Sequence, residues 1–224
     1  SVVGGLLSVE RTANIGSACI VKLSVDMKED AIIDGQVFVG AKLSVGQETG
    51  CSNSCSVGSK SVFGSDLSVL ASARFGAGVS VLQSASFGSS LTVGGIGRIG
   101  SSCSLNGNTQ VVGISSLVGR TNLNGLLSAG SSVNVGSTVS SMGAMLGSNT
   151  CSISQNTNTG WDLSIGRESY LGSSVSSNKS IFVSGSCSVQ ASEDIGGRMS
   201  ICSSILVGSQ ISGKGAVALS SWFS

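Results

Sequence analysis

Apolar residues recur along this chain with a period of six. When the sequence is divided into hexads from Ser1, the third position is apolar in 32 of 37 hexads. The first position is aliphatic or small in most hexads, and Glu193 is its one charged member. The fourth position is glycine in 17 of 37 hexads. One repeat without a shift therefore runs through the whole sequence.

This pattern predicts short strands joined by corners. Positions one and three of a strand point to the same side, and position two points to the other. The glycine and the polar residues that follow are typical of a tight corner, where a bulky side chain does not fit. Each strand can pair with the equivalent strand one coil away, so the sequence predicts an all-β, single-stranded β-solenoid.

A second period of twelve concerns the size of the inward residues. Phe63, Phe75 and Phe87 are two hexads apart, and Ala73 and Ala85 precede two of them at the other inward position. The hexads between them carry pairs such as Leu and Val. A large residue next to a small one keeps the filled volume similar, as a tightly packed interior requires.

The hexads "VGSKSV", "FGSDLS", "FGAGVS", "IGSSCS" and "LGSSVS" resemble the hexapeptide repeat of left-handed β-helices. This resemblance covers the whole chain and implies a left-handed, triangular coil of three hexads, about 18 residues. More loosely, "GSSLTV" and "GSDLSV" are similar to Gly-Ser-Ser-Leu-Ser-Val repeat proteins predicted from dinoflagellate genomes. The alternative is a flat, two-sided coil of two hexads, about 12 residues, as in some insect antifreeze proteins. Its interior holds only small residues, so the many Phe, Leu and Ile residues favour the triangular coil.

The domain prediction is a single continuous β-solenoid of 37 hexads over residues 1–224, with no inserted loop or linker. Twelve coils at a strand spacing of ~4.8 Å correspond to a rod of ~60 Å. Hexads begin at Ser1 and continue to the end without a recognisable cap. We therefore expect either that Trp222 and Phe223 cover the last coil or that further coils continue the stack. The sequence predicts no cellular compartment.

Composition argues against catalysis. The chain has no histidine, and 10% of its residues are charged, with a net charge of +1. The best-known enzymes of the resembled family are acyltransferases and carbonic anhydrases, which need histidine as a base or as a zinc ligand. We therefore expect no enzymatic activity, no cofactor and no metal. The low net charge and the absence of a long apolar run predict neither nucleic-acid binding nor a membrane span.

Two further motifs have structural interpretations. "GIGRIG" at 95–100 matches a dinucleotide-binding fingerprint, but more of the repeat follows it instead of a helix. Six of the seven cysteines occupy inward positions, where they can act as small buried apolar residues. Cys51 and Cys55 are the one local pair that could form a disulfide, and Cys202 lies at a corner.

Function is then expected in the outward side chains. Every third hexad shares one face, and two faces stand out. The first is a candidate flat polar face: Ser68, Ser86, Ser104, Asn122, Ser140, Asn158, Ser176 and Ser212, with Asp194 as its one charge. The second is a candidate apolar contact face: Val2, Ile20, Phe38, Leu146 and Phe182.

The leading functional prediction is a structural, non-catalytic β-solenoid rod that assembles with itself or with protein partners. Charge supports it, since residues 1–50 hold ten charged side chains while residues 75–150 hold only Arg98 and Arg120. A nearly neutral stretch favours packing against a partner. The alternative is an ice-binding protein that uses the flat Ser- and Asn-rich face. Known antifreeze solenoids favour threonine there, whereas here Thr92 is the only outward-facing threonine.

Overall fold

The computed structural model describes residues 2–208, 210–214 and 217–219. The described residues form strands and turns and contain no helix, and therefore no apolar helix long enough to cross a bilayer. The chain divides into two compact units, residues 1–113 and residues 114–224. Each unit is built from three parallel sheets, here called A, B and C, that take successive strands in turn.

Nineteen short strands make up the three sheets of residues 1–113. Sheet A contains β1 (Val2–Val3), β4 (Cys19–Val21), β7 (Val37–Val39), β10 (Cys55–Val57), β13 (Ala73–Phe75), β16 (Leu91–Val93) and β19 (Thr109–Val111). Sheet B contains β2 (Leu7–Val9), β5 (Val25–Met27), β8 (Leu43–Val45), β11 (Ser61–Phe63), β14 (Val79–Val81) and β17 (Gly97–Ile99). Sheet C contains β3 (Ala13–Ile15), β6 (Ala31–Ile33), β9 (Thr49–Cys51), β12 (Leu67–Val69), β15 (Ala85–Phe87) and β18 (Cys103–Leu105).

The strands of residues 114–224 follow the same order. Sheet A contains β22 (Leu127–Ala129), β25 (Met145–Gly147), β28 (Leu163–Ile165), β31 (Ile181–Val183), β34 (Met199–Ile201) and β37 (Val217–Leu219). Sheet B contains β20 (Ser115–Leu117), β23 (Val133–Val135), β26 (Cys151–Ile153), β29 (Ser169–Leu171), β32 (Cys187–Val189) and β35 (Ile205–Val207). Sheet C contains β21 (Thr121–Leu123), β24 (Val139–Ser141), β27 (Thr157–Thr159), β30 (Val175–Ser177), β33 (Glu193–Ile195) and β36 (Ile211–Gly213).

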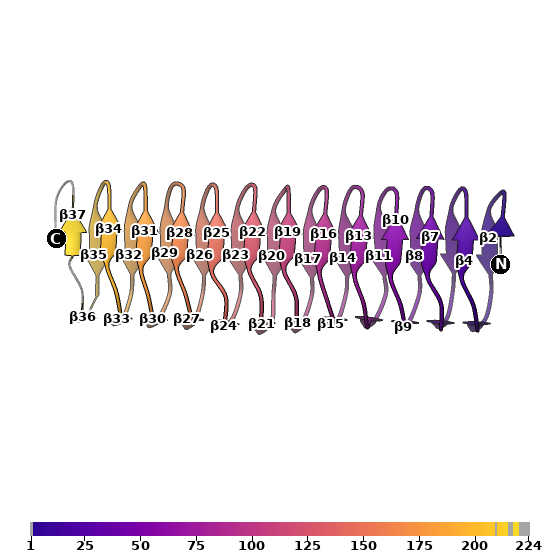
Figure 1. Cartoon of the computed structure of the whole chain (residues 1–224), viewed down its shortest axis with the longest axis horizontal. Coiled ribbons are helices and arrows are strands. Elements are labelled where there is room, and N and C mark those ends of the chain that lie inside the picture. The colour runs from indigo at the N-terminus through magenta and orange to yellow at the C-terminus, as the bar shows by residue number, and fades with distance from the viewer. Residues whose placement is uncertain (1, 209, 215–216, 220–224) are drawn as a thin grey trace. The chain divides into compact units, whose positions relative to one another are not determined.

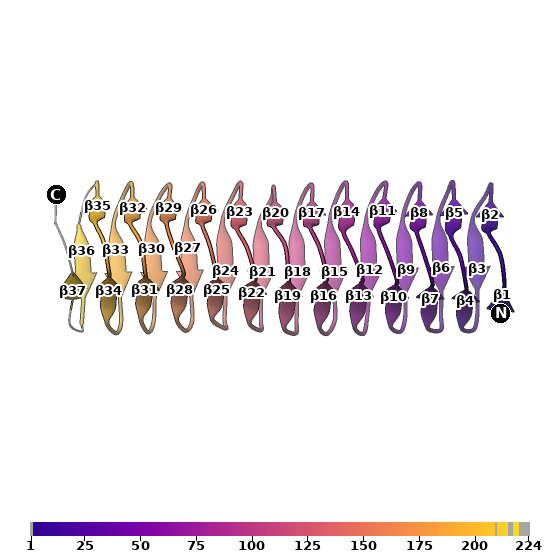
Figure 2. The same ribbon diagram turned by 90° about the horizontal axis from the view of Figure 1, so that it is seen from above.

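Within each unit every strand pairs with the strand three hexads later. Val37, for example, pairs with Cys19 on one side and with Cys55 on the other, always in parallel. Figure 1 and Figure 2 show the resulting coils side by side within each unit. The predicted three-sheet β-solenoid with three hexads per coil is confirmed. The flat alternative with two hexads per coil is wrong, because it would pair Cys19 with Ala31 instead.

Hydrogen bonds between coils continue into the corners. The amide of Cys19, at the start of β4, donates to the carbonyl of Gln36 in the corner of the next coil over 2.8 Å. The amide of Gly40, just after β7, donates to the carbonyl of Val21 in the preceding coil, also over 2.8 Å. The corner bonds therefore lengthen the ladder beyond each strand, which makes strands as short as these sustainable.

The core lies inside the coil and is filled as the hexad pattern predicts. Phe63, Phe75 and Phe87 are buried, and small Ser61, Ala73 and Ala85 share their strands. The rings of Phe63 and Phe75 meet edge to face, with centroids 6.2 Å apart and an interplanar angle of 71°. Large and small inward residues thus alternate between neighbouring positions, so that the interior stays filled without overpacking.

Six cysteines are buried inside the coils and Cys202 is exposed, all seven as free thiols. Burial raises the pKa of Cys103 and of Cys151 to about 12. An interaction between the thiols of Cys51 and Cys55 lowers the pKa of Cys51 and raises that of Cys55, with burial raising the latter further. The two thiols are therefore adjacent, and no disulfide joins them. The prediction that inward cysteines serve as small buried residues is confirmed.

Glycine at the fourth hexad position is explained by close contact between coils. No described residue has a positive φ angle, so these corners do not need the left-handed backbone that glycine permits. A Cβ atom on Gly76 would instead lie 2.2 Å from the carbonyl oxygen of Gly58, one coil earlier. The corner backbones approach each other too closely for most side chains to fit without local movement.

This close contact predicts different costs for two Gly→Ala substitutions. Gly76→Ala places a methyl group against the Gly58 carbonyl and should lower the free energy of unfolding by about 1–3 kcal/mol. Gly50→Ala is the matched control, because nothing lies within 4 Å of its new Cβ. It should change the free energy of unfolding by less than about 1 kcal/mol. Urea unfolding followed by circular dichroism measures both, and equal losses would contradict the explanation.

Candidate contact surfaces

The predicted polar face lies on sheet C. In residues 1–113, Ser68, Ser86 and Ser104 occupy the exposed middle positions of three strands that pair in sequence, β12, β15 and β18. Towards the N-terminus the next two positions are Gly50 and Ile32, so the serine ladder stops there. The ladder in this unit therefore has three polar steps.

In residues 114–224 the polar face is longer. Its middle positions are paired from strand to strand in the order Asn122, Ser140, Asn158, Ser176, Asp194 and Ser212. All are exposed except Ser176, which is half-buried. The one charged member, Asp194, interrupts an otherwise neutral row. Small hydroxyl and amide groups thus repeat at the strand spacing of ~4.8 Å.

The predicted apolar face lies on sheet A, and only its first part is continuous. Val2 pairs with Ile20, and Ile20 with Phe38, so the three side chains form one column. Their exposed fractions are 69%, 38% and 49%. The column ends at Ser56, the partner of Phe38 in the next coil. We call Val2, Ile20 and Phe38 the apolar column.

The remaining members of that face are isolated. Leu146 and Phe182 are exposed on β25 and β31 of residues 114–224. Ser164 on β28 pairs with both and therefore separates them. Trp222 and Phe223, the predicted cover of the last coil, lie outside the described residues.

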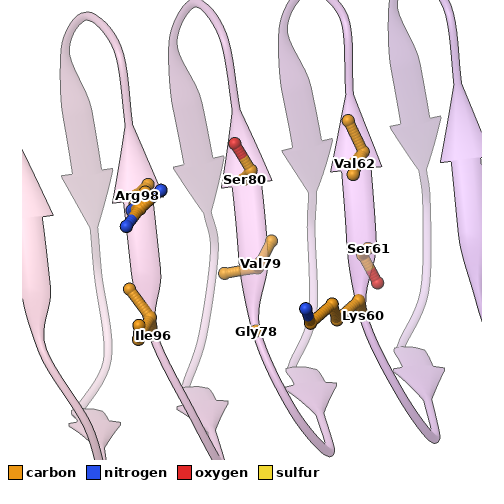
Figure 3. A pocket seen from close by; sticks show the side chains of 8 residues that line it. All are labelled: Lys60, Ser61, Val62, Gly78, Val79, Ser80, Ile96 and Arg98. Atoms are coloured by element: carbon orange, nitrogen blue, oxygen red, sulfur yellow. The ribbon is translucent and has the colours of Figure 1, made fainter.

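Sequence reasoning missed two charged ridges in residues 1–113, one in the corners before the sheet B strands and one in the corners after them. Lys42 and Lys60 directly precede β8 and β11, and we call them the basic ridge. Beside Lys60 lies an open hollow of about 230 Å³. It is lined by Lys60, Ser61, Val62, Gly78, Val79, Ser80, Ile96 and Arg98. Figure 3 shows the Lys60 side chain extending towards Gly78, which directly precedes β14, with Arg98 on the other side of the hollow.

The acidic ridge lies at the other end of the same strands. Asp30, Glu48 and Asp66 stand in the corners after β5, β8 and β11, each directly before a strand of sheet C. A second hollow of about 230 Å³ lies beside them on sheet C at Gly50. The Asp30 Oδ1 atom accepts a hydrogen bond from the Glu48 amide over 3.1 Å. The Asp66 Oδ1 atom accepts one from the Ser84 amide over 2.8 Å. Both ridges become visible in the sequence when corner residues are compared at intervals of three hexads, and not hexad by hexad.

Two exposed aromatic residues of residues 114–224 make contacts with charged side chains, Trp161 at a corner and Tyr170 in the middle of β29. The Lys179 ammonium group lies 3.6 Å from the centre of the Trp161 ring, one coil away. The Tyr170 hydroxyl donates a hydrogen bond to Glu168 over 2.7 Å, and the hydrogen bond and negative charge of Glu168 raise the pKa of Tyr170. Lys179 and Glu168 thus each have a partner within the chain. The two aromatic side chains belong to separate small patches.

Metal-ligating side chains do not cluster among the described residues. No group of three or more cysteine, aspartate or glutamate side chains among them is placed to hold a metal ion. Gly95–Gly100 lies in the repeat, with β17 (Gly97–Ile99) inside it and no helix after it within the described chain. The dinucleotide fingerprint is therefore formed by corner and strand residues.

Glu193 is the one carboxyl group inside the coil among the described residues. It lies on β33 with 1% of its surface exposed. The Cys187 thiol donates a long hydrogen bond of 3.9 Å to its Oε1 atom, and its Oε2 atom has no partner in the described chain. Burial raises the pKa of Glu193 from its usual 4.5 to about 7. An unpaired buried carboxylate is costly, so the folded state favours the protonated form.

The sequence matches no protein-family model, and neither a curated protein nor a solved structure matches it.

The raised pKa of buried Glu193 predicts that the free energy of unfolding decreases as the pH rises. Because the folded pKa is about 7 and the unfolded pKa about 4.5, the folded state binds the proton more tightly. The contribution of Glu193 to the free energy of unfolding should be largest below pH 4.5, decrease by about 3 kcal/mol between pH 4.5 and pH 7, and stay constant above pH 7. Glu193→Gln should remove this fall.

Thermal unfolding at pH 4.5, 6 and 8 measures the effect. Asp194→Asn is the matched control, because the neighbouring Asp194 is exposed, and it should keep the pH dependence of the wild type. An unchanged pH dependence in Glu193→Gln would show that Glu193 is not the titrating group.

Proposed function

We propose that this chain is a structural, non-catalytic β-solenoid that packs against further copies of itself or against other protein chains. The observation that carries the proposal is the apolar column, in which three exposed apolar side chains stand on adjacent strands. Scattered apolar residues on a surface are ordinary, whereas a contiguous apolar patch is typical of a contact site. A left-handed coil and a relation to hexapeptide-repeat proteins stay predictions that belong to this proposal.

The surroundings of the apolar column fit a protein contact. Leu6 and Leu23, at the neighbouring corners, are 73% and 51% exposed and extend the apolar area. Lys22 and Lys42 lie exposed at the same row of corners. An apolar centre with a charged rim is the usual anatomy of a protein–protein interface. The repeated coil supplies a stiff support for such a surface, because neighbouring strands fix one another.

The test removes the apolar column and keeps the fold. Ile20→Ser/Phe38→Ser introduces serine at middle positions, which Ser56 already occupies in the same sheet. We expect wild-type association to rise with concentration and the double variant to associate at least about tenfold more weakly. Size-exclusion chromatography with light scattering measures the molar mass.

The matched control is Leu146→Ser/Phe182→Ser, which makes the same kind of change where Ser164 already separates the apolar residues. It should associate like the wild type. Equal association of all three proteins would exclude the apolar column as the contact. A wild-type chain that stays monomeric at every concentration would refute self-association.

Ice binding is a second candidate, and the polar face on sheet C favours it. Small neutral groups repeat there at one strand spacing, as in Asn122, Ser140 and Asn158. Replacing this face by lysine should abolish thermal hysteresis if the face binds ice, and should leave association through sheet A intact. A wild-type protein without thermal hysteresis would remove this candidate.

A further inference from the structure

The two charged ridges of sheet B lie at opposite ends of the same strands. β8 (Leu43–Val45) directly follows Lys42 and ends shortly before Glu48. One coil later, β11 (Ser61–Phe63) directly follows Lys60 and ends shortly before Asp66. Because β8 and β11 pair in parallel without a shift, the two lysines lie side by side at the starts of these strands. Glu48 and Asp66 lie side by side in the corners that follow the same strands.

The charges within each ridge are not neutralised by the chain. Lys42, Lys60 and Glu48 are exposed, and their side chains make no hydrogen bond or ion pair in the described part of the chain. The half-buried Asp30 and Asp66 each use one carboxylate oxygen for a backbone amide of the next coil. Like charges one strand spacing apart, ~4.8 Å, repel each other, so opposite charge from outside would stabilise both ridges.

We propose that a second copy of this chain supplies that charge, with the basic ridge of one copy against the acidic ridge of the next. The match in spacing supports a second copy as the partner, because residues on both ridges recur at the same interval of one coil. Lys42 and Lys60 can therefore meet the carboxylates of Asp30, Glu48 and Asp66 step by step. The hollow at Gly50 lies beside these carboxylates and gives the lysine side chains room to approach.

This contact is heterologous, since it joins two different surfaces of the same molecule. Each copy would offer its basic ridge to one neighbour and its acidic ridge to another, so the contact continues from copy to copy unless a ring closes. The inference rests on the proposed function and names one surface through which copies pack side by side. It uses the corners before and after the sheet B strands and the hollow on sheet C, whereas the apolar column lies on sheet A.

Charge reversal and its rescue test the contact. Lys60→Glu and Glu48→Lys each place like charges on facing ridges, so each should weaken association about five- to tenfold. The combined variant Lys60→Glu/Glu48→Lys restores opposite charges between copies and should recover wild-type association. Sedimentation velocity at low and high sodium chloride measures all four proteins, and salt should weaken the wild-type contact.

Arg74→Glu, which changes the charge by the same amount on sheet A, is the matched control and should have little effect. Circular dichroism verifies that each variant is folded. Wild-type association that the two single reversals leave unchanged, or a combined variant without recovery, would overturn the charged contact while the apolar column remains. A wild type that does not associate at all would refute both.

Calcium provides one further discriminating outcome. If calcium chloride promotes association, and Glu48→Lys abolishes this effect while Lys60→Glu preserves it, the acidic ridge binds a divalent cation. The lysine–carboxylate contact would then be overturned.

Discussion

The whole structure depends on backbone hydrogen bonds between strands three hexads apart. A three-residue strand cannot persist alone, and each one here is held by its neighbours one coil before and one coil after. The amides at the corners take part as well, as the bond from Gly40 to Val21 illustrates. Successive corners are thereby drawn so close that the fourth hexad position is often limited to glycine. The inward pattern of apolar residues and the glycine frequency are thus two consequences of one ladder.

The same ladder determines the outer surface. A residue at any outward position is placed beside the residues three hexads before and after it, so one side-chain type becomes a column. This explains why Val2, Ile20 and Phe38 form a continuous apolar column, while Leu146 and Phe182 remain separate. It also concentrates charge, since Asp30, Glu48 and Asp66 are far apart in the sequence and adjacent in space. The outer surface of such a protein therefore consists of linear columns of side chains at the strand spacing.

Most of the fold could be predicted from the sequence, because the position of a residue within its hexad determines whether its side chain points inward. Val37 and Val39 needed only their positions to be placed in the core, and bulky inward residues such as Phe75 favoured the triangular coil over the flat one, which the strand pairing then excluded. The reason for the glycines could not be read as easily from the sequence, because it concerns backbone atoms of another coil. A Cβ atom on Gly76, for example, would meet the carbonyl group of Gly58. The predicted polar face forms a column within each unit, whereas the predicted apolar face is continuous only from Val2 to Phe38. The ridges of Lys42 and Lys60 and of Glu48 and Asp66 were missed because corner residues were considered hexad by hexad. That one coil runs unbroken through both units stays a prediction.

We propose that the outward columns serve as surfaces for further copies of the chain. Electron microscopy of the purified protein over a concentration series tests it most directly, because it needs no variant and no assumption about which column is used. If the outward columns bind further copies, assemblies of several copies should grow in number and size as the protein concentration rises. Separate single copies at every concentration, in both low and high salt, would contradict it.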